Sequence, residues 1–356
     1  MRDRQKLRFC TSSDGVRLAY ATVGSGPPLV KAANWLSHIE FDWGSPIWRH
    51  WIDRLSQRHT LVRYDTRGCG LSDRAPPEIS FEAWVRDLEA VADATKLERF
   101  PLLGISQGGA IAVAYAVRHP ERVSHLVLYG AFARGRLNRG KGQAGIDEML
   151  LMGKLFELGW GTDNRAFRQV FANQFLPGGS PELIEAYDEL QRQSATASDA
   201  VRILQASSQI DVTALAPLVS CPTLVMHARD EARIPFEEGR LFASLIPGAR
   251  FVPLASRNHV LLHDEPAWGH FVEELEAFLP GSPAGASFAG LTARERELLD
   301  FLARGLDNHQ IAAHLDLSEK TVRNMVSSVF DKLGVESRAQ AIVKAREAGF
   351  GAASPA

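Results

Sequence analysis

The sequence is poor in cysteine and has no long apolar run. Its 356 residues include three cysteines, Cys10, Cys69 and Cys221, which are too scattered for a disulfide framework or a zinc site. The longest apolar run, from Ala110 to Val117, is well short of the roughly 20 residues that cross a membrane. The N-terminus also lacks the apolar stretch of a secretory signal. We therefore expect a cytoplasmic protein with no membrane partner.

The composition shows no strong bias of charge either. The formal net charge is −2, with 45% hydrophobic and 23% charged residues, which excludes a disordered or strongly basic chain. Neither ligand-spaced His and Cys clusters nor a glycine-rich phosphate loop occurs, so we expect no metal and no cofactor. A length of 356 residues favours about two domains.

Short β-rich runs alternate with helical patterns over residues 1–279. The runs are Leu29–Val30, Thr60–Tyr64, Phe100–Ile105, His125–Tyr129 and Thr223–His227. This alternation predicts an α/β fold in which helices cover a mostly parallel sheet. About ninety residues separate the last two runs, so we predict a helical insertion at about 132–220. Residues 280–290 are rich in Pro, Gly, Ala and Ser and predict a linker, after which residues 291–350 show only helical periodicity.

A serine motif follows the strand predicted at Phe100–Ile105. The segment Gly104-Ile-Ser106-Gln-Gly108 leads from that strand directly into an apolar helix. Glycine is needed on both sides because the serine of a G-x-S-x-G turn lies on a tight strand-to-helix bend, where side chains would meet neighbouring backbone. The motif predicts Ser106 as a nucleophile.

Two further residues could activate this serine. Asp230 follows the last predicted strand and His259 comes later, which gives the order nucleophile, acid, base. An imidazole takes the proton of a serine hydroxyl, and a carboxylate fixes the imidazole tautomer. We predict Ser106, Asp230 and His259 as the catalytic residues. Glu231 is an alternative acid and His263 an alternative base.

Residues 7–279 resemble the α/β-hydrolase superfamily. The resemblance rests on the serine motif, on the order of the three catalytic residues and on Tyr64–Ser72, which is similar to the loop after the fourth strand of that family. It implies an α/β-hydrolase fold with a helical lid, in which the backbone N–H groups of Gln107 and Trp35 would bind an oxyanion. Where most members have His-Gly after the third strand, this chain has Ala33-Asn34-Trp35.

Tryptophan is concentrated beside this loop. The crowded residues are Trp35, Trp43, Trp48 and Trp51, with His38 among them. Helix packing explains Trp48 and Trp51. In contrast, Trp35, Asn34 and His38 are predicted to line a pocket for a small apolar or aromatic ligand. The basic stretch at residues 134–141 is predicted to be a solvated loop of the insertion.

Capping residues divide the C-terminal region into four helices. Thr292 and Glu295 form a capping-box pattern that starts the first helix, and Gly305 ends it. Further cap residues are Asp307, Ser318, Gly334 and Ser337. We therefore predict a small all-α domain of four helices.

The third of these helices has two different faces. At about 100° per residue, one face carries Val322, Val326, Val329 and Leu333, and the other carries Lys320, Arg323, Asn324, Ser327 and Asp331. Arg and Asn make bidentate contacts to guanine and adenine edges, as a recognition helix in the major groove requires. A helical protein-interaction domain with a solvated polar face is the alternative.

Residues 291 to about 345 resemble the LuxR-type helix-turn-helix. The resemblance rests on Leu291–Leu299, Thr321–Arg323 and Lys332–Val335, with Met325 where that family usually has His. It implies double-stranded DNA as a partner, with predicted contacts from Lys320, Thr321, Arg323, Asn324, Ser327 and Lys332. Nine basic and nine acidic residues balance from Gly290 onward, so one copy attracts phosphates weakly and we expect a homodimer on two operator half-sites.

Joining these two regions predicts a ligand-responsive transcriptional regulator. In this hypothesis the α/β-hydrolase-like domain binds a small molecule and shifts the population of DNA-competent dimers. An active serine esterase or related hydrolase, whose turnover is coupled to gene regulation, is the first alternative. A hydrolase-like domain that serves only as a dimerisation platform is the second, and the fold by itself does not decide among them.

Overall fold

The computed structural model describes residues 4–160, 162, 166–279, 291–335, 337–347 and 350–351. The chain divides into two compact units, Met1–Leu275 and Glu276–Ala356. The linker predicted at 280–290 lies outside the described residues. No helix among the described residues is both long and apolar enough to cross a membrane.

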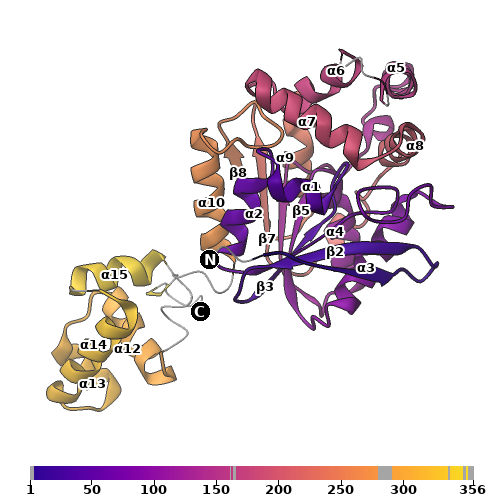
Figure 1. Ribbon diagram of the computed structural model, residues 1–356. Coiled ribbons are helices and arrows are strands. Elements are labelled where there is room, and N and C mark those ends of the chain that lie inside the picture. The colour runs from indigo at the N-terminus through magenta and orange to yellow at the C-terminus, as the bar shows by residue number, and fades with distance from the viewer. Residues whose placement is uncertain are drawn as a thin grey trace. The chain divides into compact units, whose positions relative to one another are not determined.

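An eight-stranded sheet forms the centre of the first unit, in the order β1-β2-β4-β3-β5-β6-β7-β8 (Figure 1). Strands β3 to β8 are parallel, and β1 and β2 form an antiparallel hairpin at one edge. The strands are β1 (Lys6–Thr11), β2 (Arg17–Val23), β3 (Pro28–Ala32), β4 (Thr60–Tyr64), β5 (Phe100–Ile105), β6 (Val123–Tyr129), β7 (Thr223–Ala228) and β8 (Arg250–Leu254). The predicted α/β class and mostly parallel sheet are confirmed. The hairpin escapes sequence analysis because β1 is an exposed edge strand without the apolar run of a buried one.

Helices outside the predicted insertion pack on this sheet. They are α1 (Ile39–Gly44), α2 (Arg49–Ser56), α3 (Phe81–Ala94), α4 (Gln107–Arg118), α9 (Phe236–Leu245) and α10 (Pro266–Phe278). Trp51 of α2 packs on Trp268 and Phe271 of α10, so these two helices share one face. Helix α4 packs against α3 and lies on the central strands β3 and β5. These contacts bury Trp51 in helix packing, as predicted.

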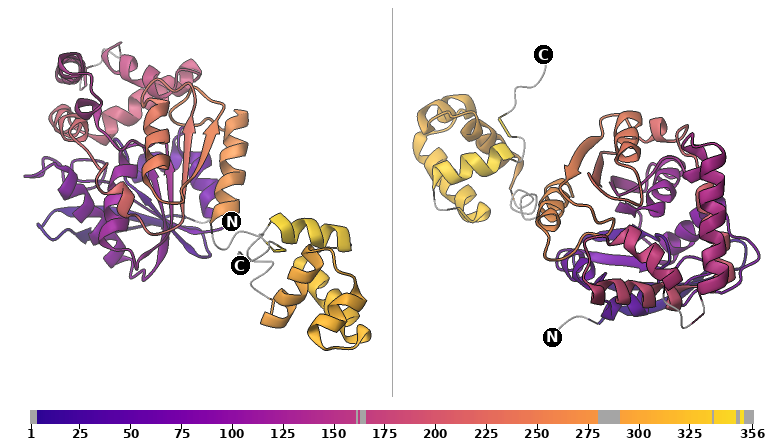
Figure 2. Two further views of the ribbon diagram at one scale, coloured as in Figure 1. Left: turned by 180° about the vertical axis from the view of Figure 1, so that it is seen from behind. Right: turned by 90° about the horizontal axis from the view of Figure 1, so that it is seen from above.

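The described residues between β6 and β7 form four helices, which we call the lid. They are α5 (Gln143–Gly159), α6 (Ala166–Phe175), α7 (Pro181–Ser194) and α8 (Ala197–Ser208), with 3-10 turns η1 (Arg136–Asn138) and η2 (Ala216–Leu218) at either side. Figures 1 and 2 show these helices gathered at one end of the sheet. Trp35, which follows β3, lies 5.9 Å from the ring of Phe156 and 5.3 Å from that of Phe171. The lid therefore covers the end of the sheet at which the parallel strands finish.

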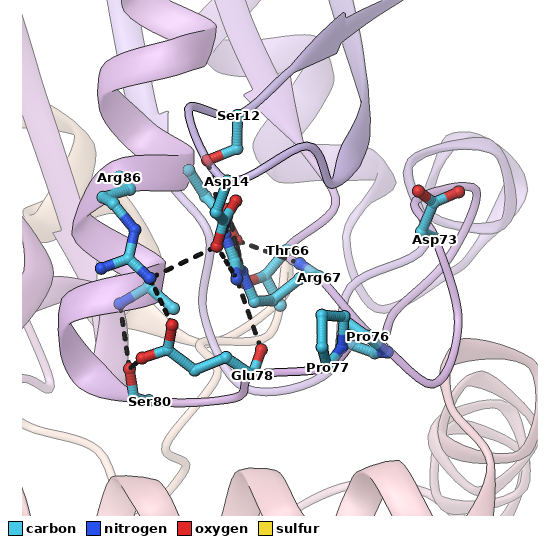
Figure 3. A network of polar contacts seen from close by, with 12 residues as sticks. Ser12, Asp14, Thr66, Arg67, Asp73, Pro76, Pro77, Glu78, Ser80 and Arg86 are labelled. Carbon is cyan, nitrogen blue, oxygen red and sulfur yellow. Dashed lines mark hydrogen bonds and ion pairs between the residues drawn. The ribbon is translucent and has the colours of Figure 1, made fainter.

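A buried arginine fixes the loop after β4. The Arg67 side chain has no exposed surface and pairs with Asp87 of α3 at 2.7 Å. It also pairs with Asp14 of the β1–β2 turn at 2.7 Å (Figure 3). Arg86 also pairs with Asp14 at 3.3 Å and with Glu78 at 2.5 Å. The hydrogen bond from Arg67 holds the pKa of Asp14 well below its usual range. This network ties the hairpin, the loop and α3 together, since an unpaired guanidinium at such depth would be costly.

The second unit is a bundle of helices α12 (Ala293–Ala303), α13 (Asn308–Leu315), α14 (Glu319–Leu333) and α15 (Arg338–Glu347). Its core consists of small and branched apolar side chains, among them Leu298, Leu302, Ile311, Leu315, Val322, Val329 and Leu333. The predicted apolar face of the third helix is buried there.

The predicted caps of these helices are present. Capping boxes at Thr292 and Asp307 start α12 and α13, and the Ser318 hydroxyl accepts a hydrogen bond from the Thr321 amide at the start of α14. Gly305 and Gly334 have φ of 89° and 63°, the left-handed backbone that follows a helix end. Local sequence signals therefore set the helix bounds of this unit.

Candidate functional sites

Ser106 lies on a strained turn between β5 and α4. Its φ of 52° and ψ of −125° are unusual for a residue with a side chain. A Cβ at position 104 would lie 2.6 Å from Gly109 Cα, and one at position 108 would lie 2.8 Å from the Ala33 carbonyl oxygen. The two glycines thus permit the close contacts that the motif predicts, and they hold the serine at the end of the strand.

The carboxylate that contacts His259 is Glu231 and not Asp230. Glu231 Oε2 lies 2.9 Å from His259 Nδ1, and neither side chain has more than 1% of its surface exposed. Asp230 is exposed, and its amide donates to the Ser256 carbonyl oxygen at 3.1 Å. Glu231, the third residue after β7, points inward and reaches the imidazole, whereas Asp230 before it faces solvent. The assignment of Asp230 is corrected accordingly, and the alternative acid takes its place at the histidine.

Glu231 also contacts a second histidine. His227, at the end of β7, has its Nε2 3.3 Å from Glu231 Oε1, and the Ile234 amide donates to the same oxygen at 2.9 Å. Burial favours the neutral acid, but His259 and His227 outweigh it and lower the pKa of Glu231. Burial likewise opposes the charge of His227, and Glu231 overrides it to raise the pKa of that imidazole. The geometry thus holds an ionised carboxylate between two imidazoles.

His259 lies beside the turn that carries Ser106. The Ser106 amide donates to the Tyr129 carbonyl oxygen at 3.0 Å, and a Cβ on the next residue, Gly130, would lie 3.2 Å from His259 Cε1. The His259 Nε2 atom is buried and has no hydrogen-bond partner among the described residues. The predicted alternative base, His263, is exposed and packs on His50 instead.

The loop after β3 brings Trp35 toward Ser106 but uses Asn34 and His38 elsewhere. Asn34 accepts a hydrogen bond from Lys31 and donates to the Trp35 carbonyl oxygen at 3.2 Å, while His38 accepts from the Phe41 amide at 3.2 Å as the cap of α1. Neither side chain lines the cavity at Ser106, which corrects that part of the predicted pocket. Within the described residues, the Trp35 N–H donates to no backbone oxygen. Because this loop contains no glycine, the strain falls on the next residue, Leu36, whose φ is 42°.

A small cavity of about 30 Å³ lies at Ser106. Its apolar lining is Trp35, Phe132, Phe175 and Ile234, and its neutral polar lining is Ser106, Gln107, Ser207 and Ser208. Three arginines, Arg136, Arg139 and Arg233, complete it. The solvated loop predicted at 134–141 is therefore wrong for two of its residues. Arg233 gives no sequence signal at all, since it is recognised only by its position beside the cavity.

A metal site at this cavity would require a group of side chains that can ligate a metal ion. Among the described residues, no group of three or more His, Cys, Asp or Glu side chains is placed to hold a metal ion.

The second unit presents a polar surface on α14. Lys320, Thr321, Arg323, Asn324 and Ser327 are exposed, opposite the buried valines. Lys332 is also exposed, but its ammonium pairs with Glu295 of α12 at 2.7 Å. All six predicted DNA contacts are thus exposed, and Lys332 has a structural partner as well.

Other basic side chains of this unit bind helix ends. Arg346 and Lys344 each donate to backbone oxygens at 2.7 Å, those of Ala303 and Leu333. Arg294 likewise donates to the carbonyl oxygen of Leu315, the last residue of α13, and Arg338 donates to that of Leu306, which follows α12. Among the described residues, Lys320 and Arg323 make no such contact. They are therefore the cations of α14 that face solvent without an internal role.

Two family models match the chain. Residues 40–177 match the alpha/beta hydrolase fold, and residues 289–345 match the bacterial regulatory proteins of the luxR family.

Relatives resemble the first unit. Over 271 residues the chain is 26% identical to a pyrrolizixenacetamide deacetylase of Xenorhabdus hominickii, which covers 74% of this chain and 94% of that protein. It is 28% identical over 244 residues to the 2-hydroxy-6-oxo-2,4-heptadienoate hydrolase of Pseudomonas putida, covering 63% and 75%. A solved esterase from Exiguobacterium antarcticum aligns with a TM-score of 0.65 at 25% identity, covering 75% of this chain and 97% of that one.

The fold, the serine turn and the α14 surface agree with these matches. The chain is a fusion of an α/β-hydrolase-fold domain with a DNA-binding domain of the luxR family, which makes it a transcriptional regulator with a hydrolase-like domain.

Proposed function

We propose that the chain is a ligand-responsive transcriptional regulator whose ligand occupies the cavity at Ser106. One observation carries this proposal: a single chain holds both a cavity at a nucleophile-type serine and an exposed polar helix face in a domain of the luxR family. Because the serine site and the DNA-binding domain belong to one chain, we expect occupancy of the serine site to change DNA binding. Since the partner is DNA, we expect the protein to act in the bacterial cytoplasm.

The size of the cavity supports a response to ligand. A volume of about 30 Å³ holds one or two water molecules but not an organic ligand. Binding therefore requires the lid to move. A ligand that binds one lid arrangement better than another shifts the population of that arrangement, which is the physical basis of a switch.

Hydrolysis at the same site is a second candidate function, favoured by the contact between Glu231 and His259. In this mechanism the Ser106 Oγ attacks an ester carbonyl while His259 Nε2 takes its proton. The Glu231 carboxylate holds the Nδ1–H of the imidazole, and the amides of Gln107 and Trp35 stabilise the oxyanion. The alcohol leaves with the proton from His259, and water then releases the acid from Ser106. Slow turnover of this kind would remove the signal that the domain senses.

DNA binding in this proposal requires two copies. Lys320 and Arg323 are the cations of α14 without an internal partner, so one copy neutralises few phosphates. A homodimer on two half-sites multiplies the affinity without new contacts to each half-site. Sedimentation of the complex should give two chains for each duplex. A monomer that binds one half-site tightly would contradict this.

Selection from a random duplex library, followed by a reporter assay, tests the function. We expect wild-type protein to enrich a palindromic duplex, called the selected duplex below, and an Arg323→Ala variant to lose it. Ser106→Ala then separates the two mechanisms when p-nitrophenyl butyrate hydrolysis is measured in parallel. Regulation that persists without Ser106, with no hydrolysis by wild type, identifies a receptor. Regulation that needs Ser106, with hydrolysis by wild type, identifies turnover as the signal, and failure to enrich any duplex contradicts the proposed function.

A further inference from the structure

Three arginines line the cavity at Ser106, and they come from two separate segments. Arg136 and Arg139 lie between β6 and α5, at the start of the lid, and Arg233 lies in the loop between β7 and α9. Burying a charge without a partner is costly, so a cavity for neutral ligands would not need three cations. Any of these arginines that lacks an acidic partner therefore indicates a negatively charged ligand.

Neutral groups hold Arg233 in place. Its guanidinium carbon lies 4.6 Å from the ring centroid of Phe171 and 5.3 Å from that of Phe175. Its Nη1 donates to the side-chain oxygen of Gln174 at 3.2 Å. Contacts with aromatic faces and an amide position a guanidinium but leave its charge in place.

Arg139 is held in the same way. Its guanidinium carbon lies 5.2 Å from the ring centroid of Phe132, and its Nε donates to the Arg134 carbonyl oxygen at 2.8 Å. The Arg134 side chain has its own carboxylate, Glu238, at 2.8 Å. Glu238 is therefore paired with Arg134 and not with Arg139.

The carboxylate of Glu148 pairs with only one of the three arginines. Arg136 pairs with Glu148, and the same carboxylate lies 3.3 Å from Lys141. Within the part of the chain that the structure describes, neither Arg139 nor Arg233 forms an ion pair. The cavity thus contains two guanidinium groups without a carboxylate.

The cluster is electrostatically strained. Burial, followed by repulsion from Arg136 and Arg139, lowers the pKa of Arg233 to about 9. Burial also lowers the pKa of Arg139 to about 10, although Glu238 attracts it. A lowered pKa means that folding disfavours the charged form, so an anion placed among the three groups would relieve the strain.

We propose that this cavity binds a small organic carboxylate with an apolar part. The carboxylate lies between Arg139 and Arg233, and the apolar part lies against Trp35 and Phe132. Guanidinium groups match a carboxylate in bidentate geometry, which favours this anion. The inference rests on the function proposed above and specifies its ligand class. It changes the predicted apolar or aromatic ligand into an acid that carries such a group.

The same anion would connect the lid to the sheet. Arg136 and Arg139 belong to the lid segment and Arg233 to the loop after β7, so a carboxylate between them stabilises the lid arrangement that holds these arginines around the bound ligand. This gives the ligand a contact that exists in one lid arrangement only, as a population shift requires.

Matched acids and amides test the ligand class on the full chain. Tryptophan fluorescence would follow thermal unfolding with phenylacetate and octanoate, and with phenylacetamide and octanamide at the same concentrations. We expect each acid to raise the melting temperature and to bind about tenfold more tightly than its amide, because the amide lacks the charge-assisted contacts. If no acid exceeds its amide, the proposal is wrong. If phenyl phosphate binds better than phenylacetate, the site is assigned to phosphate esters and the carboxylate assignment is overturned.

Charge-removing variants test the residues. Arg139→Gln and Arg233→Gln should each weaken phenylacetate binding about tenfold, and Arg240→Gln, an exposed position on α9, should leave it unchanged. Without ligand, Arg233→Gln should be at least as stable as wild type, because a repulsive charge is removed. Equal losses in Arg233→Gln and Arg240→Gln would contradict the proposal.

Binding to the selected duplex separates this inference from the proposed function. If phenylacetate binds through Arg233 but leaves DNA affinity unchanged, the carboxylate site stands and the ligand-responsive function fails. If a neutral ligand changes DNA affinity equally in wild type and Arg233→Gln, the function stands and the carboxylate site fails.

Discussion

The two units of this chain place their functional residues in opposite surroundings. In the first, Glu231 and His259 are buried and come from segments that meet only in the folded sheet. In the second, Arg323 and Asn324 are exposed on one helix, whose position depends on a nearby cap and an apolar face. A buried site is built by tertiary contacts and tolerates little change. The exposed polar face of α14, which carries Arg323 and Asn324 and which we call the reading face, is built by helix periodicity. Its polar residues can change without loss of the fold.

The largest expected effect lies in the buried site. Glu231→Gln keeps the size of the side chain but cannot hold the protonated imidazole, so hydrolysis of p-nitrophenyl butyrate should fall about 10³- to 10⁴-fold. Asp230→Asn, next to it but exposed, should change the rate less than about threefold. Steady-state kinetics checks both, and a larger loss in Asp230→Asn would return the acid to the residue that the sequence predicted.

A smaller effect is expected at the reading face. Arg323→Ala should weaken binding to the selected duplex by about 1–3 kcal/mol and relax its sequence preference, because one bidentate base contact is lost. Arg304→Ala removes the same charge from α12, where Arg304 pairs with Asp300, and should cost less. Fluorescence anisotropy measures both affinities. Equal losses would show that net charge, and not a base contact, sets the affinity.

Within the second unit, the capping box links sequence to stability. Glu295 bonds the Thr292 amide at 2.8 Å and pairs with Lys332, so Glu295→Ala should destabilise this unit by about 1–2 kcal/mol. Glu297→Ala removes an exposed partner of Arg294 and should cost at most about 0.5 kcal/mol. All seven tryptophans precede residue 269 and report on the first unit, so hydrogen exchange of α12 and α14 is the suitable measurement. Equal losses of stability in Glu295→Ala and Glu297→Ala would show that the capping box stabilises this unit no more than an exposed ion pair does.

The smallest expected effect is a pH dependence at the same residue. The hydrogen bond from Lys332, followed by that from Thr292, lowers the pKa of Glu295 to about 2. Its stabilisation is therefore complete above the unfolded pKa of about 4.3 and is lost as the pH falls toward 2. Protection of α12 should decline over this range in wild type and much less in Glu295→Gln. Equal declines in the two proteins would assign the acid sensitivity to other carboxylates.

The sequence predicts these two units with different success. Thr292, Ser318 and Gly334 act on their own helices, so the caps of the second unit follow from local pattern. The serine turn is also local, because Gly104 and Gly108 are required by contacts within one strand-to-helix bend. The fold class could be predicted as well, since strands and helices alternate along the chain.

The residues that surround Ser106 and its cavity could not be predicted in the same way. Whether Asp230 or Glu231 points inward depends on how one turn packs against a histidine 28 residues away. Arg139 and Arg233 belong to segments that meet only through the lid. A basic loop segment looks solvated in sequence, and the fold alone shows that it faces a serine.

Covalent occupancy of Ser106 tests the central claim most directly. Wild-type chain would be labelled at Ser106 with a fluorophosphonate, and its affinity for the selected duplex compared with that of unlabelled protein and of treated Ser106→Ala. We predict that labelling changes the affinity at least about fivefold, the scale of an allosteric coupling near 1 kcal/mol, and that treated Ser106→Ala shows no change. Complete labelling of Ser106 with unchanged DNA affinity would contradict the account, because occupancy of the cavity would then have no effect on the reading helix.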